Sequence, residues 1–454
     1  MDRMVNEGTG TVASPKTDRD TNATAETGAT TATSAGGGTG KGTATRAWVP
    51  RLVAVGIVLS ALNLRPAITS LGALLEEVRD GLGMSGSLAG VLTSVPPLCF
   101  AVFGVMAPRL ARRFGPAAVV CAGMVAITAG LLVRPYAGST AGFVAASALA
   151  LMGIAVSNVL MPVIVKRWFP DRVGSMTGLY SMALALGTST AAAVTVPMTK
   201  ALGGSWQTGL AVWAGLAAAA VLPWLPLVRG RGAMTAPEPA SVSVPVSGAG
   251  SVAGEPHRPA LRITRSRTAW ALAVFFGLQA TAAYITMGWM AQIFRDAGVP
   301  ASTAGLLLAV TMVMGVPLAF VIPRLATRLP HQGPIVLVLG ACGLAGYAGL
   351  YLAPAGGAWA WAVLLGIANC AFPLALTMVG MRARTGVGVA QLSAFAQSTG
   401  YLISIPGPLL VGVLYQHSGG WGLPIALMAA LMVPQMAVGV LAGRDRTVED
   451  EAAR

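Results

Sequence analysis

The stretch WVPRLVAVGIVLSALNLRPAITSL, residues 48–71, decides the class of this protein. It is long and apolar enough to cross a bilayer as a helix, because about 20 such residues span the hydrocarbon core. Arg65 stands inside this stretch. A fixed positive charge there costs roughly 2.5–3.5 kcal/mol on insertion scales, so Arg65 is expected to face a protein interior or a watery path.

The composition extends the membrane assignment to most of the chain. Of 454 residues, 55% are hydrophobic and only 10% are charged, with a mean hydropathy of +0.70. A soluble protein could not bury so much apolar surface. The net charge of +14 does not indicate a nucleic-acid partner, because the basic residues lie in short loops between apolar segments and form no single patch.

Sites for metals, cofactors and catalysis are not expected. The four cysteines all fall in apolar segments, and the three histidines fall in loops: Cys99, Cys121, Cys342 and Cys370, and His257, His331 and His417. Without a CxxC or Cys/His spacing, the cysteines are interpreted as small hydrophobic residues. The absence of HExxH, GxSxG and paired intramembrane Asp motifs argues against an enzyme. We therefore expect no disulfide, no metal and no cofactor.

Hydropathy predicts twelve membrane-spanning helices, with glycine and proline inside several of them. They are expected at residues 48–72, 86–109, 116–135, 140–165, 173–199, 207–228, 268–293, 301–324, 334–353, 358–381, 387–414 and 421–442. The longest break between spans, residues 229–267, divides them into six and six.

The charges of the loops predict the orientation. If the N-terminus is cytoplasmic, the short inner loops hold ten basic residues: Arg109, Arg112, Arg113, Lys166, Arg167, Arg172, Arg324, Arg328, Arg382 and Arg384. The outer loops then hold four: Arg79, Arg134, Lys200 and Arg295. Because positive loops stay inside, both termini are expected in the cytoplasm of a bacterial-type inner membrane.

Two short repeats indicate duplicated halves. Pro108-Arg-Leu-Ala-Arg-Arg113 recurs as Pro323-Arg-Leu-Ala-Thr-Arg328, at an offset of 215 residues. Gly153-Ile-Ala155 recurs as Gly366-Ile-Ala368, at an offset of 213 residues. Parallel repeats of this kind are typical of major facilitator transporters. We predict a disordered cytoplasmic tail at 1–46, six-helix halves at 47–228 and 268–443, a cytoplasmic linker at 229–267 and a cytoplasmic tail at 444–454.

At these residues the sequence resembles a major facilitator protein, and more narrowly the cyanate permease/2-nitroimidazole exporter (CynX/NimT) family. The resemblance covers roughly residues 48–442, and its motifs are LNLRPAITS at 62–70, APRLARRFG at 107–115, KRWFP at 166–170 and GPLLVG at 407–412. It implies an all-α membrane protein with twelve helices, whose spans 1, 4, 7 and 10 line a central path. The Asp that major facilitator proteins in general carry before the basic pair at 112–113 is missing, as is the antiporter Gly-Pro signature of span 5.

Polar side chains gather in the spans that this fold places on the path, and span 11 adds Gln397. The candidate substrate-binding residues are Asn63, Arg65, Asn158, Gln279, Tyr284, Asn369 and Gln397. Each has a structural alternative: the amides could bond to neighbouring helices at roughly 0.6 kcal/mol per bond, and Tyr284 could be a packing aromatic. For Arg65 the alternative is snorkelling to the outer interface.

Carboxylates are missing from the interior of every predicted span, so no buried carboxylate proton relay is visible. An unpaired cation among amide donors favours an anion or a polar, weakly acidic solute. Glu76 or Glu77 could still pair with Arg65 in an outward-closed state, provided that the helix breaks near Pro66. Glu77, together with Arg109 and Arg113, is therefore a gating candidate, although the two arginines also set topology.

The sequence therefore predicts a monomeric secondary active transporter that moves a small polar or anionic, cyanate-like solute by alternating access. Its partners would be the substrate and the lipid bilayer, with coupling to protons or another ion left open. One alternative is an exporter of neutral drug-like or nitroaromatic compounds. A more remote alternative is a non-transporting membrane sensor, which is weakened because the chain shows no soluble output domain.

Overall fold

The computed structural model describes residues 40–229 and 263–452, and these ranges contain helices and no strand. The tail predicted for residues 1–46 lies mostly outside the described residues, as does most of the predicted linker at 229–267. Helix α1 begins at Gly40, inside the predicted tail. The described residues from Arg46 onward pack as one unit.

The first group of helices, called here the first bundle, runs from α1 to α9. Its helices are α1 (Gly40–Asn63), α2 (Pro66–Ala73), α3 (Leu75–Leu82), α4 (Gly86–Phe114), α5 (Pro116–Val133), α6 (Thr140–Trp168), α7 (Val173–Ala201), α8 (Trp206–Val221) and α9 (Trp224–Arg229). Short 3-10 turns, η1 (Arg134–Tyr136) and η2 (Pro170–Arg172), follow α5 and α6.

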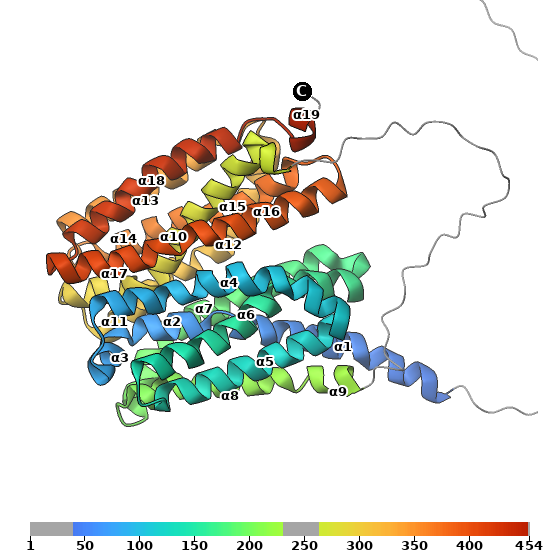
Figure 1. Ribbon diagram of the computed structural model, residues 1–454, viewed down its shortest axis with the longest axis horizontal. Coiled ribbons are helices and arrows are strands. Elements are labelled where there is room, and N and C mark those ends of the chain that lie inside the picture. Colours follow the sequence, from blue (N-terminus) through green and yellow to red (C-terminus); the bar gives the residue numbers. More distant parts are fainter. Residues whose placement is uncertain (1–39, 230–262, 453–454) are drawn as a thin grey trace, which may run out of the picture. The chain divides into compact units, whose positions relative to one another are not determined.

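The second bundle runs from α10 to α19 and lies alongside the first (Figure 1). Its helices are α10 (Arg267–Asp296), α11 (Ala301–Val313), α12 (Gly315–Arg328), α13 (Gly333–Leu352), α14 (Ala358–Asn369), α15 (Ala371–Met381), α16 (Gly386–Ser404), α17 (Pro406–Ser418), α18 (Gly422–Ala442) and α19 (Val448–Ala452). The last of these lies within the predicted tail at 444–454.

Eleven helical segments of the described residues are long and apolar enough to cross a membrane. They correspond to eleven of the twelve predicted spans. The sixth, predicted at 207–228, forms the shorter helices α8 and α9, which are separated at Leu222 and Pro223. Proline lacks the backbone N–H that a continuous helix needs, which explains the interruption. The all-helical membrane fold is thus confirmed.

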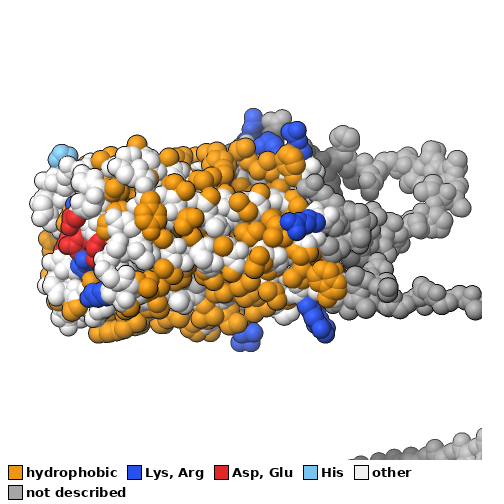
Figure 2. Space-filling view, turned by 90° about the horizontal axis from the view of Figure 1, so that it is seen from below, with side chains coloured by type: hydrophobic (Ala, Val, Ile, Leu, Met, Phe, Trp, Pro, Cys, Tyr) orange, Lys and Arg blue, Asp and Glu red, His pale blue; other side chains and the backbone are white. Residues whose placement is uncertain are grey.

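The spans run between two chemically different ends of the molecule. At one end lies α3, with the acidic residues Glu76 and Glu77; this is called the α3 end. At the other, called the basic end, helices α4 and α12 finish in exposed arginines such as Arg113 and Arg328. Figure 2 shows an apolar belt between an end with an acidic cluster and an end where Lys and Arg side chains gather. This is the surface of a protein that spans a bilayer.

Glycines allow the helices to approach closely. A Cβ on Gly153 of α6 would lie 2.4 Å from the carbonyl oxygen of Gly123 in α5. A Cβ on Gly366 of α14 would lie 2.8 Å from the carbonyl oxygen of Thr311 in α11. Membrane helices associate through such small residues, because lipid provides little hydrophobic drive for helix pairing. The repeated Gly-Ile-Ala motif therefore marks a packing contact in each bundle.

Candidate functional site: a central cavity

A break in the first span places Arg65. Helix α1 ends at Asn63 and α2 begins at Pro66, so that Arg65 occupies the junction with φ −126° and ψ −27°. Proline disfavours the helical conformation of the residue before it and cannot donate to the preceding turn. The helix therefore does break near Pro66, a break that the sequence left open. This break allows the Arg65 side chain to leave the helix axis within the span.

A cavity of about 250 Å³ lies between the two bundles. Its polar lining residues are Arg65, Ser181, Thr188, Tyr284, Thr311, Asn369 and Tyr401. The other walls are largely apolar and come from α7, α10, α12 and α15. Among the lining residues within the described ranges, Arg65 alone carries a charge. The cavity is therefore a mostly apolar chamber with one positive group.

Aromatic rings surround the Arg65 guanidinium. Its central carbon lies 5.8 Å from the centroid of the Phe100 ring, within cation–π range. The Tyr284 hydroxyl of α10 is a hydrogen-bond partner of Arg65, and the neutral phenols of Tyr180 and Tyr401 lie near the guanidinium. These phenols come from both bundles, so the arginine is held at their interface.

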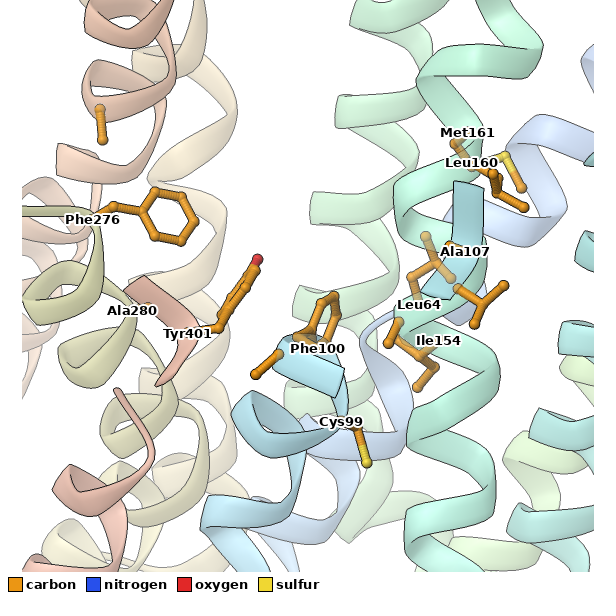
Figure 3. Close-up of a cluster of buried hydrophobic side chains, with 14 of the residues drawn as sticks. Leu64, Cys99, Phe100, Ala107, Ile154, Leu160, Met161, Phe276, Ala280 and Tyr401 are labelled. Carbon is orange, nitrogen blue, oxygen red and sulfur yellow. The ribbon is translucent and has the colours of Figure 1, made fainter. Parts of the chain in front are cut away.

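The aromatic residues also form a chain across the interface. Phe100 of α4 lies 5.1 Å from Tyr401 of α16, measured between ring centroids. Tyr401 lies 5.2 Å from Phe276 of α10 in an edge-to-face arrangement. Figure 3 shows these two rings near each other. Offset and edge-to-face pairs are favourable arrangements of aromatic quadrupoles. A movement of one bundle against the other must therefore change the Phe100–Tyr401 contact beside Arg65.

Among the predicted substrate-binding residues, Arg65, Tyr284 and Asn369 line the cavity. Gln279 lies behind Asn369: its amide nitrogen donates to the Asn369 backbone and side-chain oxygens, at 2.9 Å each. Gln435 donates in turn to Gln279, also at 2.9 Å. This network orients the Asn369 amide from behind.

The other predicted amides bond elsewhere and do not line the cavity. Asn63 donates to the backbone oxygens of Leu59 and Leu216, at 2.8 and 3.1 Å. Asn158 accepts a bond of 2.5 Å from the Tyr180 hydroxyl, and Gln397 donates to Ser393 within its own helix at 2.7 Å. Asn158 therefore reaches the site only through Tyr180, whose phenol lies near Arg65.

The predicted gating residues lie at opposite ends of the bundle. Glu77 accepts from Arg295 at 2.8 Å, and Glu76 lies 2.6 Å from the same guanidinium. Arg295 belongs to α10, so these ion pairs join the two bundles. In this state the carboxylates pair with Arg295 and not with Arg65. Arg109 and Arg113 are exposed at the basic end, where Arg113 lies over the ring of Phe114.

Further contacts join the bundles at the α3 end. The backbone N–H of Ser87 donates to Gln416 at 2.8 Å, and the Trp289 indole donates to Thr93 at 3.2 Å. A Cβ on Gly72 would lie only 2.0 Å from the Met287 carbonyl oxygen, so α2 and α10 are in backbone contact there. The two bundles are thus in direct contact at the α3 end.

The Major Facilitator Superfamily model matches residues 53–404 of the chain. The chain belongs to this superfamily. It is 34% identical to an uncharacterized transporter, YycB, of Bacillus subtilis over 87% of this chain and 94% of the relative. It is 31% identical to the 2-nitroimidazole transporter of Escherichia coli, over 87% and 95% of the two chains.

A third relative, the cyanate transport protein CynX of E. coli, is 28% identical over 84% of this chain and 94% of its own length. Among solved structures, the inward-open xylose transporter XylE of E. coli matches with a TM-score of 0.66 at 12% identity, covering 89% and 99% of the two chains. The major facilitator fold and the resemblance to the CynX/NimT family are confirmed. As a member of this superfamily, the protein is a multi-pass secondary transporter of small solutes and not an enzyme.

Sequence reasoning missed one buried charge. Arg134 was counted among the outer loop residues, but its side chain is only 2% exposed. The turn η1 folds back so that Arg134 reaches α2. A signal was available, because Arg134 precedes Pro135 at the end of an apolar run, just as Arg65 precedes Pro66. The hydropathy count treats such a residue as a loop, since it has no information about the turn.

Proposed function

We propose that the transporter moves a small anion or weakly acidic polar solute, with Arg65 as its principal contact. The observation that carries this proposal is the charge of the cavity: within the described ranges its lining includes the Arg65 cation and no carboxylate. An arginine in a low-dielectric site is strongly attractive to an anion, and its fork of donors suits small oxyanions and linear anions.

Three neutral donors would complete the site. The hydroxyls of Tyr284 and Tyr401 and the amide of Asn369 all line the cavity with Arg65. They come from α10, α16 and α14, whereas Arg65 comes from the first bundle. A bound anion would therefore bridge the bundles and neutralise the charge between them. Alternating access would follow as the bundles rock about this site.

The names of two relatives support small solutes of this size. One is a cyanate transport protein, which supports a cyanate-like anion as substrate here. The other is a 2-nitroimidazole transporter, which supports the second candidate, a neutral nitroaromatic compound. The aromatic and apolar walls, including Phe372 and Tyr401, favour that candidate. The unpaired charge of Arg65 is the reason to place the anion first.

For orientation, we propose that the basic end faces the cytoplasm of a bacterial-type inner membrane and that both termini lie inside. The α3 end then faces outward, and the state described here is closed to the outside. Both bundles and the whole cavity come from one chain, which supports a monomer as the working unit. Proton coupling is common among major facilitator transporters, but the cavity offers no carboxylate among the described residues to carry it.

Flux of radiolabelled cyanate into proteoliposomes tests the proposal. Arg65→Gln should lower flux more than twentyfold, because it removes the attracting charge, whereas Arg65→Lys should retain part of it. Arg446→Gln, which removes an exposed arginine outside the spans, is the matched control and should transport normally.

Two results would contradict the proposal. One is that cyanate neither enters the proteoliposomes nor competes for transport. The other is that cyanate flux persists in the Arg65→Gln variant. If 2-nitroimidazole moves under the same conditions and is indifferent to Arg65, the neutral-solute candidate takes its place. Collapsing the proton gradient in the same assay tests whether coupling involves protons.

A further inference from the structure

Arg134 is a second buried arginine, and its contacts do not neutralise it. Its Nη1 donates to the Ala67 carbonyl oxygen at 2.9 Å, and its Nη2 donates to the Ser70 hydroxyl at 3.4 Å. The ring of Phe143 lies 6.0 Å from its guanidinium carbon. All three partners are neutral, and no carboxylate among the described residues forms an ion pair with Arg134.

The donors of Arg134 exceed the acceptors around it. A guanidinium has five N–H donors, and its Nε has no partner in the described structure. The hydroxyl of Ser147, a residue only 1% exposed, is likewise buried without a partner. Buried polar groups are normally hydrogen-bonded. Two neighbouring buried groups without a partner, the Arg134 Nε and the Ser147 hydroxyl, therefore indicate a missing ligand.

A small cavity connects these two groups. It measures about 20 Å³ and is lined by Arg134 and Ser147 together with Thr93, Tyr284 and neighbouring apolar residues. A cavity needs roughly 10–15 Å³ of this kind of volume to hold a single water-sized particle. The space therefore suits one water molecule or one small anion. The uncompensated charge of Arg134 favours the anion, because a buried ion requires a counter-charge.

The position of this cavity relates it to the central one. Tyr284 lines both, so the two chambers lie on either side of one side chain. The smaller chamber is also lined by Gly72 and Gly288, at the close contact between α2 and α10 at the α3 end. It therefore lies on the α3 side of Tyr284, between the central cavity and that end.

We propose that Arg134 forms a second anion-binding station, which takes a halide-sized or linear triatomic monovalent anion and lies on the route between the α3 end and Arg65. The anion would contact the Arg134 guanidinium and the Ser147 hydroxyl. Tyr284 would separate the two stations and could donate its hydroxyl to an anion on either side. The route deepens the proposed function and rests on it, whereas anion binding at Arg134 is testable without transport.

Bromide and azide are suitable probes for the purified full-length protein. Bromide can be located by its anomalous scattering in crystals, and azide binding can be measured by titration calorimetry. We expect anomalous density beside the Arg134 guanidinium and a second site in the wild-type azide titration. Arg134→Gln should remove both. Arg65→Gln should leave the Arg134 density in place.

A second variant keeps the proposal testable if Arg134→Gln fails to fold. Ser147→Val keeps Arg134 and its bond to Ala67 but fills the small cavity, so it should weaken binding at this site at least tenfold. Ser147→Ala is its control, because it removes the hydroxyl without filling the space, and should weaken binding by less. Cyanate flux should then also be lower in Ser147→Val than in Ser147→Ala.

The proposal is overturned if bromide density is absent beside Arg134, or if Ser147→Val binds azide as the wild type does. In those cases Arg134 acts only as a structural tie to α2. Failure of the proposed function is distinguishable, because it would abolish the effect of Arg65→Gln on cyanate flux while leaving the bromide density beside Arg134 unchanged. Density at Arg134 with unaltered flux in Ser147→Val would overturn the route.

Discussion

The two ends of the molecule differ in which parts their polar contacts join. At the α3 end, the ion pairs of Arg295 with Glu76 and Glu77 connect the first bundle to the second. At the basic end, the polar contacts of α19 stay within the second bundle: Glu451 accepts from Thr268 at 2.7 Å, and Glu449 accepts from Thr385 at 3.1 Å. Polar contacts at the α3 end therefore hold the two bundles together. The polar contacts of α19 at the basic end stabilise the second bundle alone.

This difference shows which interactions between the bundles must break during the transport cycle. Apart from the Arg65–Tyr284 contact in the cavity, the hydrogen bonds and ion pairs between the bundles among the described residues lie on the α3 side. To open that side, the protein must break partly exposed ion pairs and separate backbones in contact. A substitution at the α3 end should therefore shift the balance of states, whereas one at the basic end should change stability alone.

The largest expected effect comes from Gly72→Ala. The new Cβ would meet the Met287 carbonyl oxygen at 2.0 Å, far inside contact distance, so α2 and α10 must move apart. Overpacking of this kind costs about 1–3 kcal/mol, and here the cost falls on the closed state. We expect at least a tenfold change in flux and a longer distance between spin labels at Leu202 and Leu352, which lie at the α3 end of the two bundles.

Gly215→Ala is the matched control for that prediction. Gly215 is also a helical glycine, in α8, but a Cβ there would meet nothing within 4 Å. Alanine in a helix is about 0.5–1 kcal/mol more favourable than glycine, so flux should be unchanged and stability unchanged or higher. An unaltered label distance in Gly72→Ala would contradict the view that this contact closes the α3 end.

A smaller shift is expected from Arg295→Gln. It removes two ion pairs between the bundles, whose side chains are 16% exposed for Arg295 and 40% and 33% exposed for Glu76 and Glu77. Exposed pairs contribute up to about 1 kcal/mol each, so the closed state should lose up to about 2 kcal/mol. The same spin labels should report a larger open population at low salt, and the effect should weaken as salt screens the charges.

Arg384→Gln is the comparison for that variant. Arg384 lies 2.7 Å from Asp450, in an exposed ion pair within the second bundle. Its removal should leave the distance across the α3 end unchanged. Equal shifts in the two variants would show that the loss of any surface arginine, and not the bridge between bundles, alters the equilibrium.

The smallest effect is expected at α19. Partial burial opposes ionisation of Glu451, but bonds from Ser266 and Thr268 outweigh it and hold the pKa of this carboxyl below its ordinary value. Its stabilisation is therefore present above the ordinary glutamate pKa of about 4.3 and is lost as the pH falls through the lower folded-state pKa. Because the group is only partly buried, its contribution should stay under about 1 kcal/mol after solvent screening.

Thermal unfolding at several pH values measures this contribution. Glu451→Gln should melt slightly below the wild type at pH 7, and the gap should shrink below about pH 4 as the wild-type carboxyl takes up a proton. The distance between the labels at the α3 end should not change at pH 7. A gap that stays constant from pH 7 to pH 3 would show that the charge of Glu451 does not stabilise α19.

The sequence predicted much of the fold because membrane insertion is a local property. Eleven spans of the described residues follow from hydropathy, and Pro66 located the break that frees Arg65. The sequence alone could not predict the partner of Glu77, because Arg295 is 218 residues away along the chain. It also missed the burial of Arg134, since a turn of three residues decides whether an arginine points to lipid headgroups or into the bundle.

By itself, the sequence determined that this chain is a helical membrane protein, where its spans lie, and that Arg65 is the charge to explain. Each of these follows from the cost of placing a given residue in hydrocarbon, which depends mainly on that residue and its near neighbours. The tertiary structure alone decided that Arg65 and Tyr284 share one cavity, that Asn63 lies outside it, and that the bundles are tied at the α3 end. Those outcomes depend on how helices distant in sequence pack, and no local pattern records that packing.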